Sequence, residues 1–186
     1  MVARVLGLLL LLFAVPALAD EYDDTLKTFR EAGQSGRLFA KSYGYAVFPT
    51  IGKGGIGIGA AHGNGRVYAK GKHVGDASMT QITVGAQLGG QAYSQVVFFE
   101  DKRAFDEFTS GNFEFGAQAT AVAITAGATA QAGSAGATAS ASAGQRDAKT
   151  SGEYRKGMAV FIVVKGGLMY EASVGGQKFS YTPRKP

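Results

Sequence analysis

The sequence contains no cysteine, and it has only two histidines, His62 and His73, among its 186 residues. Without thiols the chain forms no disulfide, and its N-terminal region offers no cysteine for lipid attachment. Two imidazoles without thiolates also fall short of a structural zinc site, which normally has four protein ligands. The fold must therefore be held by a hydrophobic core, for which residues 20–186 are long enough.

Charged residues are also sparse, at 18% of the chain, with 19 Lys and Arg against 14 Asp and Glu. Losing Arg4 with the leader described below leaves 18 against 14, or a net charge of +4. The basic residues are scattered and form no stripe interleaved with aromatics, so we expect no nucleic-acid partner. A mildly basic surface is better suited to anionic lipid.

Long hydrophobic runs are limited to one, from Val5 to Val15, which is short for a membrane span. Arg4 precedes this run, and the small-x-small sequence Ala17-Leu18-Ala19 follows it. This order is typical of a cleaved secretory signal, whereas a retained anchor is the alternative. We therefore predict a signal peptide over residues 1–19 and a single domain over 20–186 that is periplasmic or secreted.

Two helical regions are predicted in a chain that is otherwise mostly β. The first covers residues 22–41 in two parts, with Leu26, Phe29 and Ala32 at helical spacing, and the second is short and lies near 101–110. Phe105 and Phe108 of the second helix are expected to pack on a sheet. The residues expected to cap or end the helices are Asp23 or Asp24, Gly33, Glu100 or Asp101, and Gly111.

From Tyr43 onward, glycines and one proline are predicted to separate short strands. The segment 81–88 alternates, with Ile82, Val84, Ala86 and Leu88 on one face, and "GMAVFIVV" is typical of a strand buried on both faces. Residues 117–123 are predicted to be a strand with an alanine face, and the segment from Gly127 a strand or loop. Pro49 is expected to end its strand or to place it at an edge of the sheet, and the other expected strand ends are at Gly63-Asn64-Gly65, Gly89-Gly90, Lys165-Gly166-Gly167 and Gly175-Gly176.

These elements predict a mainly β (α+β) fold, a single antiparallel sheet or barrel-like domain with an N-terminal helical segment.

The glycine-rich stretch "PTIGKGGIGIGAAHGNG" matches the spelling GxGxxG but not its context. A dinucleotide loop must open a helix, whereas here Ile56 and Ile58 alternate with glycine as in a strand. We therefore predict a bare strand face, Gly55 to Ala61 at every second residue, that packs against a neighbour such as the alanine face of 117–123. The glycines assigned a structural role are Gly52, Gly54, Gly55, Gly57 and Gly59.

No catalytic constellation is found. There is no GxSxG elbow, and His73, Asp76 and Ser78 are interpreted as polar residues of a surface connection. The carboxylates around residues 100–107 are explained by helix capping and solvation. We expect neither an enzyme nor a cofactor or metal.

The remaining functional interpretation is a surface on which basic residues contact lipid headgroups and tyrosines lie at the membrane interface. The alternative is that the basic residues are ordinary solvated cations and the aromatics belong to the core. The candidate lipid-binding residues are Arg30, Arg37, Lys41, Lys53, Arg66, Lys70, Lys72, Tyr43 and Tyr45.

Four segments together resemble the SYLF domain, also called the Ysc84-like or DUF500 domain, in its bacterial secreted form. They are "SYGYAVFPTIGKGGIGIGAAHGNGRVY", "QLGGQAYSQVVFFED", "FTSGNFEFGAQATAVAI" and "KGMAVFIVVKGGLMYEASVGGQKFSY", and the likeness runs from Leu38 to Tyr181. The resemblance implies lipid binding, since eukaryotic relatives bind phosphoinositide membranes and some bind or bundle actin. It supplies no catalytic residues, and the chain has no SH3 or FYVE module beside the domain.

The leading hypothesis is a secreted, non-catalytic protein that binds anionic phospholipid or phosphoinositide-like headgroups, with no actin expected as partner in that compartment. The alternative is an envelope structural or protein-interaction module whose Ala/Gly/Ser/Thr-rich segment, residues 127–144, contacts a protein partner. A third interpretation, an outer-membrane β-barrel, fits the alternating strands but not the continuously apolar "MAVFIVV".

Overall fold

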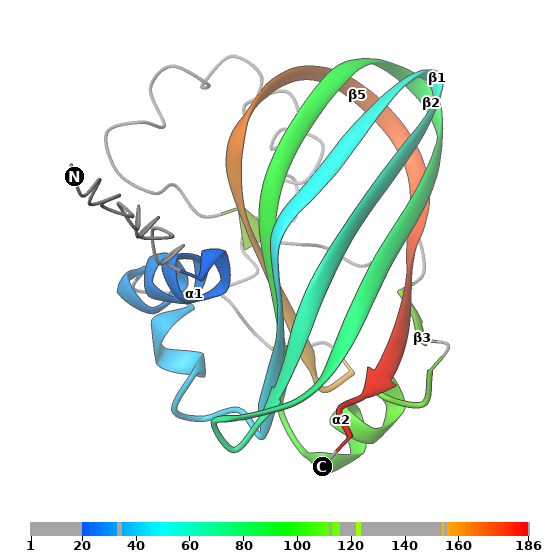
Figure 1. Ribbon diagram of the computed structural model, residues 1–186. Coiled ribbons are helices and arrows are strands. Elements are labelled where there is room, and N and C mark those ends of the chain that lie inside the picture. The colour runs from blue at the N-terminus through cyan, green and yellow to red at the C-terminus, as the bar shows by residue number, and fades with distance from the viewer. Residues whose placement is uncertain are drawn as a thin grey trace, which may run out of the picture.

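The computed structural model describes residues 20–32, 35–111, 113–115, 122–123, 154 and 156–185. The predicted signal peptide and segment 127–144 lie outside this part of the chain. The described residues are mainly β, as predicted, with helices at the N-terminus and after the second strand (Figure 1). The elements are α1 (Glu21–Glu31), η1 (Gly36–Leu38), β1 (Gly44–Ala69), β2 (Lys72–Phe99), α2 (Lys102–Phe108), β3 (Phe113–Phe115), β4 (Val122–Ala123) and β5 (Met158–Pro183).

The sheet is built on three very long strands that bend over at one end of the molecule. The antiparallel order is β1-β2-β5-β3, and β4 pairs with β5 in parallel. Figure 1 shows β1, β2 and β5 rising together, curving over at the top and descending on the other side. As a result, the two halves of β1 approach each other, and Lys70 N–H donates to the Tyr43 carbonyl at 3.2 Å.

Glycines make the bend. In β1 the chain turns at Gly55 to Gly59, where Gly57 has φ +69° and an added Cβ on Gly55 would clash with the Ile58 carbonyl oxygen. The register with β2 shifts at the same place, between Ile56 and Ile58. Left-handed backbone of this kind favours glycine. We call residues 55–60 of β1 together with the paired residues 82–89 of β2 the bend.

The strand ends predicted at glycines were wrong because these positions stay hydrogen-bonded to neighbouring strands. Pro49 does not end β1 but lies inside it at a register shift, and β1 is an edge strand of the described sheet, as the alternative prediction for Pro49 expects. The turn between β1 and β2 lies instead at Lys70-Gly71, both at positive φ, +49° and +77°, as a tight type I′ hairpin requires. Strands run through the other expected breaks, at Gly63-Asn64-Gly65, Gly89-Gly90, Lys165-Gly166-Gly167 and Gly175-Gly176.

An aromatic core fills the inside of the curved sheet. Phe48, Phe99 and Phe179 are fully buried there, and α2 covers them through Phe108. The short helix is as predicted: the Asp101 carboxylate accepts from Ala104 N–H at 2.8 Å as its N-cap. Phe105 and Phe108 both pack on Phe99, and Gly111 ends the segment with φ +100°.

A second core covers the outer face of the same strands. Leu26 and Phe29 of α1, together with Leu38 of η1, pack on this face. Val160 of β5 belongs to the inner core and its neighbour Phe161 to the outer one, so the prediction that "GMAVFIVV" is buried on both faces is confirmed. The N-cap of α1 is Asp20 rather than Asp23 or Asp24.

The predicted packing of a neighbour against the bare glycine face is present only in part. An added Cβ on Gly59 would meet the side chains of Gln87 and Thr83, so a close neighbour exists there. At Gly57 nothing lies within 4 Å, and glycine is required there for its positive φ rather than for packing. Of the expected partner, residues 117–123, the structure describes only Val122 and Ala123, which pair with β5 and not with β1.

Candidate functional site

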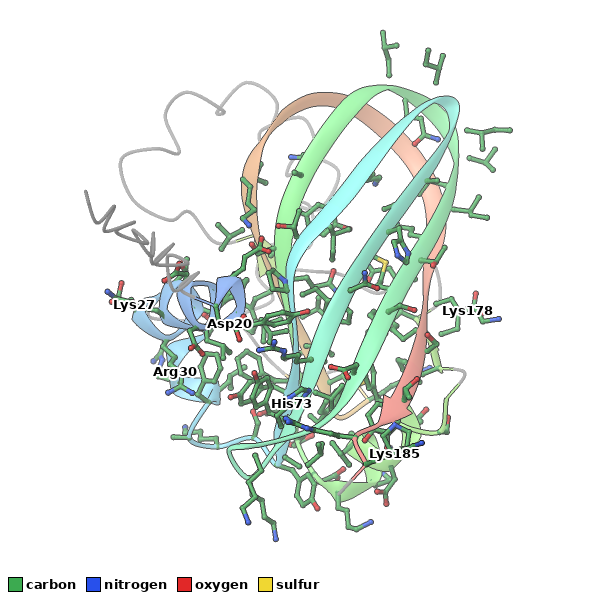
Figure 2. All side chains as sticks on the ribbon, viewed as in Figure 1. Asp20, Lys27, Arg30, His73, Lys178 and Lys185 are labelled. Atoms are coloured by element: carbon green, nitrogen blue, oxygen red, sulfur yellow. The ribbon has the colours of Figure 1, made fainter. Side chains whose placement is uncertain are left out.

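The bend carries an exposed row of branched aliphatic side chains. They lie opposite one another on the paired strands, Ile56 beside Leu88 and Ile58 beside Val84, with Ile82 one rung further along. We call them the apolar tip, and their exposed fractions are Ile56 79%, Ile58 66%, Ile82 63%, Val84 63% and Leu88 55%. Figure 2 shows side chains projecting outward at this end, away from α2 and the C-terminus. Clustered exposure of large apolar groups marks an interaction surface more often than ordinary protein surface.

The inner face of the bend is polar. Thr83 and Gln87 are 2% and 5% exposed, and the Thr83 hydroxyl donates to the Gln87 amide oxygen at 2.7 Å. The Gln87 amide nitrogen donates to the Gly57 and Thr83 carbonyls at 3.1 and 3.0 Å. These bonds satisfy the buried polar groups and hold the bend in one conformation. The alternation predicted for 81–88 is therefore present with its apolar face outward.

On β1 and β2, the strands that form the apolar tip, negative charge is rare. Residues 44–99 contain one acidic side chain, Asp76, whose ladder neighbour is Arg66, well away from the bend; on the adjacent β5, Glu171 is in register with Gln87. Lys53 lies on the β1 arm that leads to the bend, opposite Gln91. The tip is thus apolar with a basic side chain on its approach.

The structure does not gather the predicted lipid-binding residues into one site. Tyr45 is 6% exposed, stacks on Tyr68 at 5.0 Å and belongs to the outer core, where burial raises its pKa. Arg66 forms an ion pair with Asp20 and lies over the Tyr22 ring at 4.0 Å. Tyr45 is therefore a core aromatic, as the alternative interpretation expects, whereas Arg66 is paired with Asp20 rather than solvated as that interpretation expects.

The other predicted basic residues are more open and lie mainly at the end opposite the bend. Arg30 of α1 is exposed and stacks over Phe39 at 4.9 Å. Lys70, at the β1–β2 turn, lies 5.7 Å from the centre of the Tyr43 ring. Arg37, Lys41 and Lys72 are exposed near η1 and the same turn, whereas Lys53 lies on the arm toward the bend.

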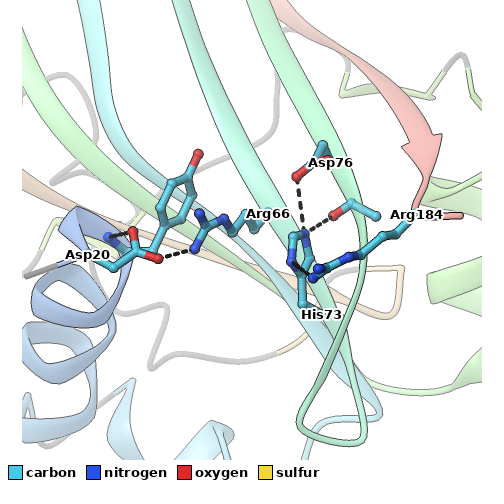
Figure 3. A network of polar contacts seen from close by, with 7 residues as sticks. Asp20, Arg66, His73, Asp76 and Arg184 are labelled. Atoms are coloured by element: carbon cyan, nitrogen blue, oxygen red, sulfur yellow. Dashed lines mark hydrogen bonds and ion pairs between the residues drawn. The ribbon is translucent and has the colours of Figure 1, made fainter. Parts of the chain in front are cut away.

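Two polar networks connect Asp20, before α1, and Arg184, after β5, to the β1–β2 hairpin (Figure 3). In one, Asp20 pairs with Arg66. In the other, Arg184 Nη1 donates to His73 Nδ1 at 3.0 Å, so His73 carries its proton on Nε2 and donates to Asp76 at 3.1 Å. Their side-chain roles are structural.

Neither network resembles a catalytic or metal site. Ser78, considered with His73 and Asp76 in the sequence, instead forms a hydrogen bond with the hydroxyl of Ser180, its partner on the adjacent β5, at 2.6 Å. Over the described residues no group of three or more His, Asp or Glu could hold a metal ion. In the same part of the chain no helix has the length and apolarity needed to cross a membrane.

The Asp20–Arg66 pair predicts a pH-dependent contribution to stability. The Arg66 hydrogen bond lowers the pKa of Asp20 below its ordinary value of 3.8. A depressed folded-state pKa stabilises the fold above the unfolded-state pKa, and that contribution is lost as pH falls through the folded value. We expect Asp20→Asn, which keeps a good N-cap, to lower the free energy of unfolding at neutral pH by at most about 1 kcal/mol because the pair is partly exposed.

Urea unfolding of both proteins at neutral pH and at about pH 3 checks this, since carboxylates titrate in that range. The difference between the two proteins should shrink at the lower pH. A difference that is equal or larger in acid would contradict the assignment.

Comparison of the chain with known proteins identifies its family. A family model for Ysc84, described as "Las17-binding protein actin regulator", matches residues 80–184, which include most of β2, α2 and all of β5. The chain belongs to the Ysc84 (SYLF) family. This agrees with the resemblance seen in the sequence.

A curated Ysc84-family relative, "Beta cell expansion factor A" from Aeromonas veronii, is 30% identical over 156 residues. The alignment covers 83% of this chain and 51% of the relative, so the chain spans about half the relative's length. Neither description names a catalytic activity. No solved structure matches.

The apolar tip was missed by sequence reasoning, although its signal was present. The alternation of Ile82, Val84 and Leu88 indicated a one-sided strand, but an amphipathic strand normally turns its apolar side toward the core. At the bend the orientation is the opposite: Thr83 and Gln87 are hydrogen-bonded on the inner side, and the aliphatic side chains face outward.

Proposed function

We propose that this protein is a non-catalytic lipid-binding protein that associates with the surface of anionic phospholipid membranes. The observation that carries the proposal is the apolar tip: five exposed branched aliphatic side chains at one end of the molecule, on a bend held by internal hydrogen bonds. A convex row of aliphatic side chains suits a fluid apolar medium, because acyl chains can surround it.

The expected binding free energies favour the apolar tip over the basic residues as the main contact with the membrane. Full burial of one Val, Leu or Ile side chain contributes about 1.5–3 kcal/mol, so five partly exposed ones contribute roughly 5–10 kcal/mol before losses of motional freedom. A lysine near an anionic surface contributes about 1 kcal/mol. Lys53 then supplies a preference for anionic headgroups rather than most of the affinity.

The proposed location is outside the cytoplasm. The leader-like segment of residues 1–19 supports cleavage after Ala19, which releases a chain beginning at Asp20. Asp20 is the N-cap of α1, so a chain beginning there retains every residue of the first helix. The protein then meets phospholipid as a peripheral protein of the periplasm or the exterior.

Flotation or co-sedimentation with vesicles of phosphatidylcholine and phosphatidylglycerol tests the proposal. The matched variants are Ile58→Thr/Ile82→Thr/Val84→Thr, which keeps β-branched shape while adding hydroxyls, and Ile82→Val/Val84→Ile, which keeps the tip apolar. We expect residues 20–186 to bind, the threonine variant to lose at least about tenfold in affinity, equal to 1.4 kcal/mol, and the aliphatic variant to bind normally.

Urea unfolding of the three proteins serves as the control, because exposed substitutions change stability little. Wild-type protein that stays unbound, or a threonine variant that binds as tightly as wild type, would refute the proposal. Capture of a protein partner that depends on residues 127–144, without any vesicle binding, would favour the alternative of an envelope interaction module.

A further inference from the structure

The apolar tip covers three outward-facing pairs of β1 and β2, Ile56 with Leu88, Ile58 with Val84 and Ala60 with Ile82, and it ends on both sides. On one side, the next outward-facing pair after Ala60 and Ile82 is His62 and Thr80, whose side chains lie 3.4 Å apart. On the other side the rung beyond Ile56 and Leu88 is Gly54 paired with Gly90. A polar pair limits insertion on one arm of the bend, and bare backbone limits it on the other.

The tip is also closed to lipid entry. Gln87 bonds to the Gly57 carbonyl across the inside of the bend, and Gly59 lies directly against Gln87 and Thr83. Among the described side chains of β1 and β2, a lipid tail beneath the tip therefore meets hydrogen-bonded polar groups rather than an apolar interior. Contact requires the tip to enter the bilayer, not the reverse.

The composition of the tip leaves apolar insertion as the dominant contact. Its exposed residues are aliphatic, and the bend, residues 55–60 and 82–89, contains no charged or aromatic side chain, although Tyr170 and Glu171 of the adjacent β5 are in register with Leu88 and Gln87. In a tightly packed bilayer, the headgroups hinder insertion of a short apolar segment that has little electrostatic attraction to them. Where headgroups are further apart, acyl chains are exposed and the apolar tip can cover them. Interfacial segments with low charge are known to depend on curvature and lipid composition for this reason.

Resting on the proposed function, we infer that the apolar tip selects bilayers by lipid packing: it binds highly curved or unsaturated membranes and discriminates against flat, tightly packed ones. Headgroup charge is the weaker determinant. The ligand class is exposed acyl-chain surface between phospholipid headgroups.

The absence of native cysteine permits a local reporter. Ala60→Cys places an environment-sensitive fluorophore beside the tip, and Lys72→Cys places the same fluorophore at the opposite end, by the β1–β2 turn. Both positions are exposed, so labelling leaves the cores untouched. The vesicles hold the phosphatidylcholine to phosphatidylglycerol ratio constant and vary in diameter and in acyl-chain unsaturation.

We expect small or unsaturated vesicles to bind at least about tenfold more tightly than large saturated ones, a difference of 1.4 kcal/mol. The spectral shift should occur at Cys-labelled position 60 and not at 72, and added salt should weaken binding less than saturated chains do. Equal affinity for small and large vesicles of one composition, or a shift at position 72 alone, would overturn the packing inference while leaving lipid binding standing. Failure to bind any vesicle would overturn both.

Discussion

Replacing Phe179 with alanine is expected to lower the free energy of unfolding by about 3–5 kcal/mol, the usual effect of removing a buried phenyl ring. Phe179 is 0% exposed and joins the curved sheet to the elements that cover its open end. Its ring centroid lies 5.6 Å from that of Phe48 in β1 and 5.1 Å from that of Phe108 in α2. It also lies 6.3 and 5.5 Å from Phe113 and Phe115 in β3. One truncation therefore loosens three elements together.

The matched control is Lys178→Ala, the preceding residue on β5, whose side chain is exposed on the opposite face. Urea unfolding followed by circular dichroism measures both variants, and the control should change stability by no more than about 0.5 kcal/mol. Similar losses for the two variants would show that Phe179 does not organise this core. A variant that fails to accumulate as folded protein, while the control does, agrees with the prediction because the expected loss approaches the total stability of many domains.

Introducing one methyl group at Gly65 is expected to lower the free energy of unfolding by about 1–3 kcal/mol, as overpacking in a dense interior does. An added Cβ would lie 2.6 Å from the Val47 carbonyl oxygen and 2.6 Å from the Phe48 ring. Both contacts are with the first half of β1, which lies against the second half because of the bend. The backbone of Val47 is held in the ladder with β2 and cannot move aside cheaply.

Gly52→Ala is the matched control on the same strand, since nothing lies within 4 Å of its added Cβ. There we expect no loss, or a gain of about 0.4–1 kcal/mol from reduced freedom of the unfolded chain. Thermal or urea unfolding of the pair decides the matter. If Gly65→Ala is as stable as Gly52→Ala, then the two halves of β1 are not in contact and the bent architecture is wrong.

The glycines illustrate how far local sequence reasoning extends. Their density was interpreted as a bare strand face and as a series of turns, but most of them lie within continuous strands. The Lys70-Gly71 turn, in contrast, has no Asn-Gly or Asp-Gly signature, and it was overlooked in favour of Gly63-Asn64-Gly65. Strand pairing on both sides of residues 63–65 outweighs their turn propensity because each ladder hydrogen bond adds to a cooperative sheet.

For the candidate site, local sequence patterns predicted even less of the arrangement than they did for the glycines. Several predicted cations, such as Arg66, are paired or stacked, and Tyr45 is buried, because a residue type reveals its chemistry but not its neighbours. The prediction that Ile82, Val84 and Leu88 share one face is confirmed. Which face meets water depends on the curvature of the whole sheet, and this curvature arises from contacts between residues far apart in the chain.

The sequence by itself determined the β-rich class, the family, the capped helix at residues 102–108 and the doubly buried strand that begins β5, because each rests on local periodicity, capping chemistry or a specific run of residues. The tertiary structure decided where β1 bends, which glycines are crowded and which apolar side chains remain exposed at the tip. These depend on contacts between distant residues: Gln87 donates to the Gly57 carbonyl across the bend and bonds with Thr83 inside it, and Ile82, Val84 and Leu88 are left exposed on the outer side.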